Sequence, residues 1–187
     1  NRVARLAIDG EATAGATLLL DERWRRRPVG LVSTGPLEDA QPLLSDLYYL
    51  ERALEPFTEI YRGDIQSLLQ RPLAILALPD VGALPETELA ALESWVERGG
   101  LLLRFAGPRL AEADDRLLPV ALRRGGRALG GAMTWDAPVH LSPFHADSPF
   151  AGLALPKDVA IRQQVLAEPA LDLPAKTWAQ LSDDTPL

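Results

Sequence analysis

Four short apolar segments recur along the middle of the chain and predict the strands of a sheet. Residues 29–32, 73–78 and 101–105 are continuous or nearly continuous apolar runs, and residues 57–61 alternate apolar and polar positions. A strand covered on both faces by helices has an unbroken apolar sequence, whereas alternation is typical of a sheet edge. We therefore predict a central parallel strand at residues 73–78 and a strand near an edge at residues 57–61.

Amphipathic stretches separate these segments and predict helices. The first, over residues 40–55, carries leucines whose spacing places them on one helical face: Leu43, Leu47, Leu50 and Leu54. Pro56 ends this helix because a proline has no backbone N–H and clashes with the preceding turn. A shorter helix is predicted over residues 64–70.

The clearest helical pattern begins beside Pro85. A proline suits the first turn of a helix, and Glu86 and Glu88 lie near the positive end of the helix dipole. The predicted buried stripe of this helix consists of Leu89, Leu92 and Val96. Gly99 suits the left-handed residue that commonly follows a helix.

The two ends of the chain lack this regular alternation. Residues 3–8 and 16–20 are apolar runs that predict a β-hairpin, and a basic stretch at residues 23–27 separates it from the rest. Beyond residue 115, glycines and prolines predict long loops between short strands, at residues 127–135, 137–142, 159–166 and 176–182. We therefore divide the chain into a hairpin with a junction, residues 1–27, and an α/β domain, residues 28–187.

Alternating strands and helices predict an α/β fold. Each parallel connection crosses over through a helix, so the expected architecture has three layers, with helices on both faces of a mainly parallel sheet. The N-terminal β-hairpin and a loop-rich C-terminal β portion are additions to this layout.

The composition is that of a packed domain and excludes several chemistries. Of the 187 residues, 47% are apolar, which is enough to offset the entropy lost on folding. The net charge of -7 argues against a nucleic-acid partner, whose phosphates would be repelled. The chain has no cysteine, which excludes disulfides, thiolate metal sites and cysteine nucleophiles. No apolar run approaches the roughly 18 to 20 residues that span a bilayer.

Several segments resemble a family of proteobacterial membrane proteins. They are residues 76–82 (LALPDVG), 93–100 (ESWVERGG) and 101–110 (LLLRFAGPRL), and the resemblance extends to residues 147–153 (DSPFAGL) and 177–181 (TWAQL). Members of that family carry an N-terminal double-transmembrane region, a class I glutamine amidotransferase-like domain and a C-terminal domain of unknown function. The resemblance therefore implies a flavodoxin-like or class I glutamine amidotransferase-like sheet.

The resemblance also implies that this chain is part of a longer, membrane-anchored protein. Residues 3–20 are then the tail of a preceding β-rich domain, and a final strand and helix after Leu187 complete the sheet. The family's double-transmembrane region typically has a basic loop between its two helices. The positive-inside rule makes that loop cytoplasmic, so the region after the second helix lies outside the inner membrane. We therefore expect a periplasmic domain anchored to the inner membrane by its parent protein.

The same resemblance argues against catalysis. Active class I amidotransferases use a cysteine on a sharp turn after a strand, activated by a histidine with a carboxylate behind it. The strand that ends at Phe105 is the counterpart here, and Ala106, Gly107 and Pro108 follow it. None of these side chains can form a covalent acyl intermediate, so we expect no glutamine hydrolysis.

Two groups of residues remain as candidates for a site. Asp80 follows the central strand, where open α/β sheets bind ligands, and is a candidate general base or cation ligand. The alternative is a carboxylate that accepts backbone N–H groups in the turn before Pro85. His140, His145 and Asp147 are candidate ligands of zinc or iron. Pro143 argues against a helix there, and the alternative is a proline-rich surface loop with solvated histidines.

Two weaker signals concern anions. Ser33-Thr34-Gly35 could hold an anion on its backbone N–H groups, but it lacks the glycine pattern of dinucleotide sites and the lysine of a P-loop. A plain turn is the alternative. The basic junction could bind anionic lipid, and the alternative is a solvated linker: Arg23, Arg25, Arg26 and Arg27.

These observations lead to two hypotheses. The first is a non-catalytic binding or scaffolding module without a cofactor. It has protein partners in a membrane-associated assembly and reaches the membrane only through segments outside this chain. The second is a metal- or carboxylate-dependent hydrolase with its site around Asp80, at the carboxyl edge of the sheet. A concave pocket that holds both Asp80 and His145 would favour the second hypothesis.

Overall fold

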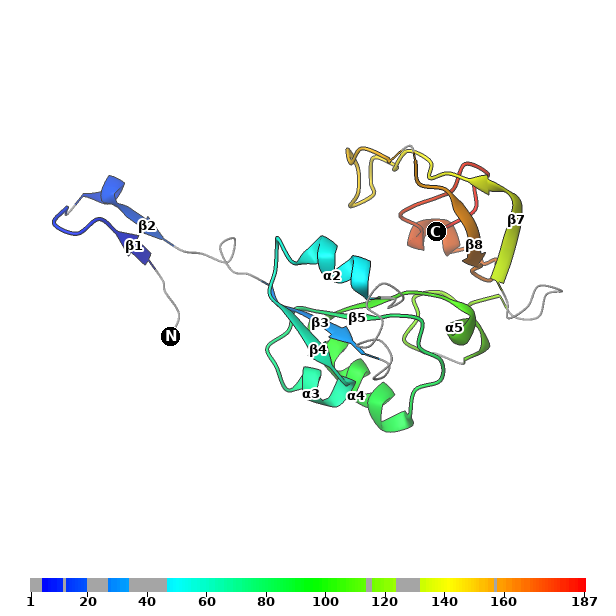
Figure 1. Cartoon of the computed structure of the whole chain (residues 1–187), viewed down its shortest axis with the longest axis horizontal. Coiled ribbons are helices and arrows are strands. Elements are labelled where there is room, and N and C mark those ends of the chain that lie inside the picture. The colour runs from blue at the N-terminus through cyan, green and yellow to red at the C-terminus, as the bar shows by residue number, and fades with distance from the viewer. Residues whose placement is uncertain are drawn as a thin grey trace.

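The structure is built around a four-stranded parallel sheet (Figure 1). Its strands are β3 (Val29–Val32), β4 (Ile60–Gly63), β5 (Ile75–Leu78) and β6 (Leu101–Arg104), in the spatial order β4-β3-β5-β6. The first of these strands in the chain lies second in the sheet, an order compatible with a flavodoxin-like layout. The computed structural model describes residues 5–11, 13–19, 27–33, 47–113, 116–123, 132–156 and 158–187.

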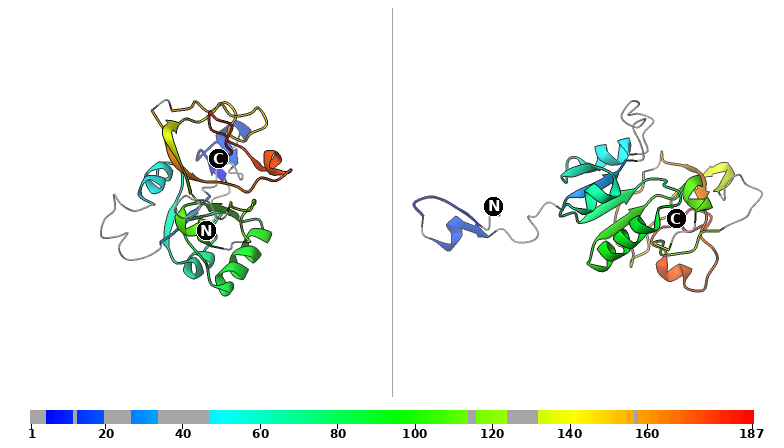
Figure 2. Two further views of the ribbon diagram at one scale, coloured as in Figure 1. Left: turned by 90° about the vertical axis from the view of Figure 1, so that its right-hand side faces the viewer. Right: turned by 90° about the horizontal axis from the view of Figure 1, so that it is seen from below.

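Helices lie on both faces of this sheet (Figures 1 and 2). On one face, α2 (Tyr48–Leu54) packs its leucines against β3 and β5. On the other face, α3 (Ile65–Leu69) and α4 (Glu86–Glu97) cover the same two strands. The predicted α/β class and the parallel central strand are therefore confirmed.

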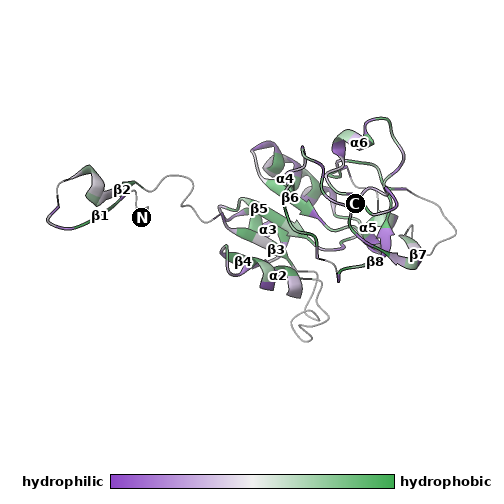
Figure 3. Cartoon of the chain, turned by 90° about the horizontal axis from the view of Figure 1, so that it is seen from above, coloured by the Kyte–Doolittle hydropathy of each residue, from purple (hydrophilic) through white to green (hydrophobic). Residues whose placement is uncertain are grey.

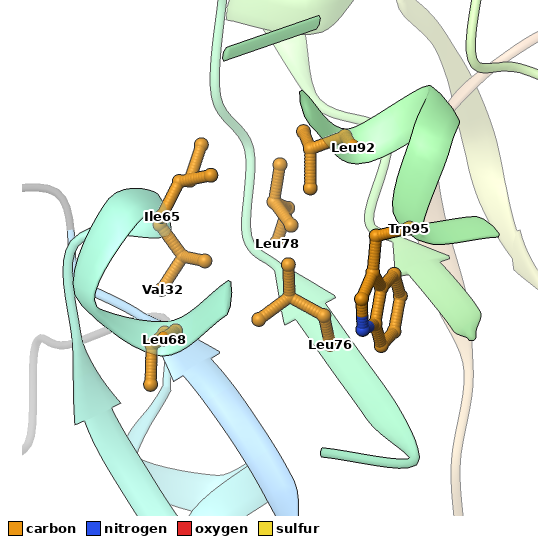
Figure 4. Packing of buried hydrophobic residues seen from close by; sticks show 7 residues of the cluster. All are labelled: Val32, Ile65, Leu68, Leu76, Leu78, Leu92 and Trp95. Atoms are coloured by element: carbon orange, nitrogen blue, oxygen red, sulfur yellow. The ribbon is translucent and has the colours of Figure 1, made fainter. Parts of the chain in front are cut away.

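The larger core cluster lies between the sheet and the two helices α3 and α4. Figure 4 shows side chains from β3, β5 and both helices pointing toward one another: Val32, Ile65, Leu68, Leu76, Leu78, Leu92 and Trp95. Five of these seven side chains are leucine or isoleucine, whose burial is the main favourable term in folding. This cluster fixes α4 on the sheet and thereby positions the loops at both of its ends.

The buried stripe of α4 differs from the prediction at one position. Leu89 and Leu92 are buried as expected, but the third buried residue is Trp95, whereas Val96 is 38% exposed. A β-carbon added at Gly100 would lie 2.5 Å from the indole ring of Trp95, so the chain after the helix passes directly over this ring. Gly99 has the predicted left-handed conformation, with φ of 95°.

The edge strand β6 is not covered on both faces, in contrast to the prediction. Leu101, Leu103 and Phe105 are 58%, 41% and 43% exposed, while Leu102 on the opposite face packs against the larger core cluster. The α2 helix covers the β3 side of its face and does not reach β6 in the contacts of the described residues. In Figure 3 the strands β3, β5 and β6 are largely apolar, so exposure of β6 leaves apolar surface open.

The start of one predicted strand shifts for a local reason. The strand predicted at residues 57–61 begins at Ile60, because the N–H groups of Phe57 and Thr58 both bond to the carbonyl of Leu54 and finish the last turn of α2. Phe57 is 79% exposed as a result. Residues 40–46 of the predicted first helix lie outside the described residues.

The predicted N-terminal hairpin is present. β1 (Arg5–Ala7) and β2 (Thr17–Leu19) pair antiparallel, and a short 3-10 turn, η1 (Ala14–Ala16), precedes β2. Among the described residues these two strands pair only with each other, and Figure 1 shows them apart from the sheet. No residue of the described hairpin is buried. The division at residue 27 stays a prediction.

The C-terminal portion is irregular, and its strands differ from those predicted. After α5 (Pro108–Glu112), β7 (Ala132–Val139) pairs antiparallel with β8 (Ile161–Val165). A register shift between Thr134 and Val139 replaces the predicted break between two strands, because Pro138 cannot donate to a ladder. The strand predicted at residues 176–182 is wrong: α6 (Leu173–Lys176) ends there, and only isolated bridges follow.

Short backbone contacts attach this portion to the sheet region. Residues 121–123 bond to residues 166–168 through the N–H of Arg123 and the N–H of Glu168, at 2.8 and 2.7 Å. Beneath them, Ala111 of α5 and Val165 of β8 form a small buried cluster with Leu122. The end of β6 and the C-terminal portion are therefore joined through α5.

Candidate functional site

Asp80 lies at the carboxyl end of β5, where the sequence predicts a ligand or catalytic carboxylate. Its Oδ2 accepts a hydrogen bond from the backbone N–H of Arg109 at 3.0 Å, and its Oδ1 accepts one from the N–H of Leu110 at 2.9 Å. The Arg109 guanidinium in turn donates to the carbonyl of Asp80 at 3.3 Å. Asp80 therefore satisfies the first N–H groups of α5, whereas the predicted alternative placed its donors in the turn before Pro85.

The turn after β6 packs directly against this carboxylate. A β-carbon added at Gly107 would lie 2.4 Å from the carboxyl carbon of Asp80, which is far inside any normal contact. Ala106 and Pro108 flank this glycine. The turn after β6 is thus without a nucleophilic side chain. It is also too close to Asp80 for a larger residue at Gly107.

The three candidate metal ligands do not converge. His145 and Asp147 are neighbours, with 3.4 Å between the imidazole Nδ1 and the carboxylate Oδ2, and both side chains are strongly exposed. His140 instead directs its Nδ1 to the carbonyl of Val159 at 2.9 Å. In the part of the chain that the structure describes, no group of three or more histidine, cysteine, aspartate or glutamate side chains is arranged to hold a metal ion.

His145 and Asp147 instead line an open hollow of about 440 Å³ in the C-terminal portion. The hollow lies between residues 143–148 and residues 174–180. Asp80 is not among its lining residues, so this hollow does not unite Asp80 with His145. This hollow therefore does not bring together Asp80 and His145, which the hydrolase hypothesis requires in one pocket.

Two aromatic rings line this hollow, Phe144 from one segment and Trp178 from the other, and Phe150 lies against both of them. Phe150 contacts both neighbours, with centroids 5.4 Å from Phe144 and 6.3 Å from Trp178. Trp178 nevertheless remains 57% exposed. The sequence alone did not predict a site at these rings, although Phe144 and Phe150 lie among the closely spaced prolines of residues 143–150. Their approach to Trp178 depends on tertiary structure.

A buried serine joins the two segments. Ser148 is 7% exposed, donates from its hydroxyl to the carbonyl of Trp178 at 2.8 Å, and accepts from the N–H of Phe150 at 3.2 Å. Ser142 adds two bonds across the same gap, from its N–H to the carbonyl of Gln180 and from its hydroxyl to that of Leu181. Both walls of the hollow are therefore fixed to each other through polar contacts.

The ion pairs between Arg116 and α4 stabilise the fold at its surface. Arg116 bonds in a bidentate manner to Glu86 and also bonds to Glu93, both on α4. The guanidinium lowers the pKa of Glu86 below its ordinary value, and the two carboxylates raise the pKa of Arg116. Because these groups lie on the outer side of α4 and satisfy each other, they hold the chain after α5 to that helix.

In the C-terminal portion, two carboxylates have lowered pKa values. The indole N–H of Trp135 donates to Asp183 at 2.8 Å and, together with Thr185, lowers the pKa of that carboxyl. Lys176 has the same effect on the pKa of Asp172, which precedes α6. Both pairs stabilise charged side chains at the surface.

The residues predicted to bind anions lie partly within the described chain. Ser33 directly follows β3, and its N–H donates to the carbonyl of Gly63 at 3.0 Å, so it continues the sheet pairing. Thr34 and Gly35 lie outside the described residues, as do three of the four arginines of the basic junction: Arg23, Arg25 and Arg26.

No helix within the described residues is long and apolar enough to span a bilayer. No family model, curated protein or solved structure matches the chain, so the candidate site rests on its own geometry.

Proposed function

We propose that this chain is a non-catalytic, class I glutamine amidotransferase-like binding or scaffolding module of a membrane-anchored bacterial protein. Its partners are proteins of a membrane-associated assembly. The fold class and the sequence resemblance support the amidotransferase-like layout, and the turn after β6 with its contact to Asp80 supports the absence of catalysis.

One observation carries this proposal: the contact between Asp80 and the turn after β6. Nucleophilic catalysis at this edge requires a side chain that can attack and a base that is free to activate it. Ala106-Gly107-Pro108 offers no such side chain, and both oxygens of Asp80 accept backbone N–H groups. A carboxylate held by two backbone N–H groups stabilises the turn and is not free to take a proton from a nucleophile.

Enzyme assays test the absence of catalysis. Purified protein is assayed with glutamine, with a p-nitrophenyl ester and with p-nitrophenyl phosphate, each with and without added zinc. We expect no turnover above that of a denatured sample. Turnover that is abolished by Asp80→Asn or His145→Ala, in variants whose circular dichroism matches the parent, would overturn the proposal in favour of the hydrolase. His145 is strongly exposed, so its substitution is not expected to disturb the fold.

The proposal places the domain in the periplasm, anchored through the parent protein. The resemblance supports this location through the positive-inside rule. Alkaline phosphatase fused after Leu187 in the parent gene is then active, and a cytoplasmic reporter at the same junction is silent. The reverse pattern contradicts this location and leaves the absence of catalysis as a separate question.

A further inference from the structure

The hollow between residues 143–148 and residues 174–180 has walls that are fixed before any ligand arrives. Its two segments are held together by the hydroxyl groups of Ser148 and Ser142, both of which donate to backbone carbonyls of the facing segment. Leu181, directly beneath, is fully buried. A site whose walls are already ordered loses little conformational entropy when it binds.

The aromatic lining is suited to flat, rigid, apolar rings. Phe144 and Trp178 line the hollow from its two segments, Phe150 lies against both rings, and Pro143 and Pro174 add further apolar surface. Trp178 is the most exposed of the three rings. Proline side chains pack well on such surfaces, and proline-rich segments dock in aromatic-lined grooves.

Two side chains of the hollow have free hydrogen-bond donors. Within the described part of the chain, the indole N–H of Trp178 and the carboxamide of Gln180 have no hydrogen-bond partner, although both residues line the hollow. The backbone carbonyls of Trp178, Ala179 and Gln180 are all occupied, by Ser148, Leu187 and Ser142 respectively. The lining therefore cannot extend a ladder to an added strand through these carbonyls. It presents donors to a ligand that offers carbonyl oxygens.

A polyproline II segment meets this requirement. Its prolines have no N–H to satisfy, and its carbonyl groups point outward because the helix has no internal hydrogen bonds. A saccharide, in contrast, presents many hydroxyl donors, and the hollow offers them a single carboxylate, Asp147.

The charge of the hollow selects for a basic residue in the ligand. Asp147 is 93% exposed beside His145, and the ion pair of Asp172 with Lys176 is internally neutralised. The whole chain carries a net charge of -7, which attracts cationic segments at a distance. An arginine or lysine beside the prolines would pair with Asp147.

We propose that the hollow lined by Phe144, Trp178 and Asp147 binds a proline-rich, basic segment of a partner protein in the polyproline II conformation. This inference rests on the proposed function, because it names the kind of partner that the binding module takes. The rings hold the prolines, Trp178 and Gln180 donate to peptide carbonyls, and Asp147 pairs with the basic side chain.

Isothermal titration calorimetry of the whole chain with a synthetic peptide tests this proposal. The probe is a dodecapeptide of two Pro-Pro-Leu-Pro-Pro-Arg repeats. One control peptide has glutamate in place of arginine, and another has glycine in place of alternate prolines. Cellotriose and chitotriose are titrated in parallel as saccharide probes. Phe57→Ala serves as the matched protein control, since Phe57 is an exposed aromatic residue of the sheet region.

We expect the arginine peptide to bind saturably and both control peptides to bind more weakly. Trp178→Ala should weaken binding by at least about tenfold, as expected for an aromatic residue at the centre of a contact. Trp178→Phe should weaken binding less than Trp178→Ala, because it keeps an aromatic ring, although a smaller one, and removes the N–H donor. Asp147→Asn should weaken the arginine peptide by up to about fivefold and leave the glutamate peptide no weaker. Phe57→Ala should bind like the parent.

Three results would overturn the inference: no saturable heat with the arginine peptide, equal binding by Trp178→Ala and the parent, or saccharide binding that depends on Trp178 without peptide binding. Because Trp178 and Asp147 are exposed, their variants are expected to remain folded, which circular dichroism verifies. Blank enzyme assays without peptide binding remove this inference alone. Turnover in those assays removes the proposed function whether or not the peptide binds.

Discussion

Asp80 and Gly107 form a contact between the ends of β5 and β6 that depends on both residue types. Asp80 supplies two acceptors for the backbone N–H groups of Arg109 and Leu110, and Gly107 leaves the space that this approach requires. The sequence predicts Asp80 at the carboxyl end of a strand and leaves its role open between a base and a structural acceptor. The geometry favours a structural acceptor, but its donors lie 29 and 30 positions away in the chain and not in the predicted turn before Pro85.

Gly107→Ala should destabilise the protein by about 1–3 kcal/mol, because the new methyl group meets the Asp80 carboxylate and forces the turn apart. The measurement is the free energy of unfolding in urea. Gly82→Ala is the matched control at the same end of the sheet, since its β-carbon would make only an ordinary 3.5 Å contact with the carbonyl oxygen of Arg109. Equal losses in the two variants would contradict the close contact at Gly107.

The helix α4 shows how an element can be predicted well in its extent and wrongly in one face residue. Pro85 at its N-cap and Gly99 after its end were readable from the chain, because both act through local backbone geometry. The choice between Trp95 and Val96 was not local. Both positions are compatible with a stripe through Leu89 and Leu92, and the passage of the chain at Gly100 over the indole decides that Trp95 is buried.

Alanine substitution at these two adjacent positions separates the two assignments. Trp95→Ala should lower the free energy of unfolding by about 3–5 kcal/mol, because it empties part of the larger core cluster. Val96→Ala should change it by no more than about 0.5 kcal/mol, because Val96 is partly exposed and alanine favours the helix. If Trp95→Ala does not fold, Trp95→Phe with its smaller ring gives the measurable loss. A greater loss at Val96 than at Trp95 would contradict the structure.

At the scale of the whole molecule, the two parts of the described chain are stabilised in different ways. The sheet region has two clusters of buried apolar side chains. Within residues 132–156 and 158–187, by contrast, the only buried apolar side chains are Val165 and Leu181. Polar contacts between distant segments hold that portion together, among them Ser148 with Trp178 and Trp135 with Asp183. A carboxylate takes part in one of these contacts, so we expect acid to weaken this portion.

The Trp135–Asp183 contact should make part of the stability depend on pH. Hydrogen bonds lower the folded-state pKa of Asp183 below the unfolded value of about 3.9, so the unfolded chain binds the proton more readily. The stabilisation is therefore complete above that value and is lost as the pH falls through the lower folded pKa. Asp183→Asn should be less stable than the parent at neutral pH, and the difference should shrink toward pH of about 3. Urea unfolding at both pH values measures it.

Trp135→Phe provides the matched control for this titration. It keeps an aromatic ring on β7 and removes the N–H that donates to Asp183. The acid-dependent part of the stability should decline in this variant in the same direction as in Asp183→Asn. A loss of stability in Asp183→Asn that is equal at neutral and acid pH would contradict a role for the charged carboxylate.

The sequence by itself determined the α/β class, the parallel central strand at β5, the ends of α4 and the absence of a nucleophile after β6. These features depend on local periodicity, on the backbone limits of proline and glycine, and on which side chains are present at all. The exposed face of β6 could not be derived in this way, because an apolar run has the same sequence whether or not another layer covers it.

Only the tertiary structure decided the state of the candidate site. It assigned the oxygens of Asp80 to α5, separated His140 from the pair of His145 and Asp147, and brought Phe150 against Trp178, which lines the hollow. Each of these contacts joins residues that are 19 to 30 positions apart or lie on different segments. Chain periodicity specifies which side of an element a residue lies on. Its partner across the molecule is fixed only when the elements pack, because packing selects one arrangement among many with equally well-formed elements.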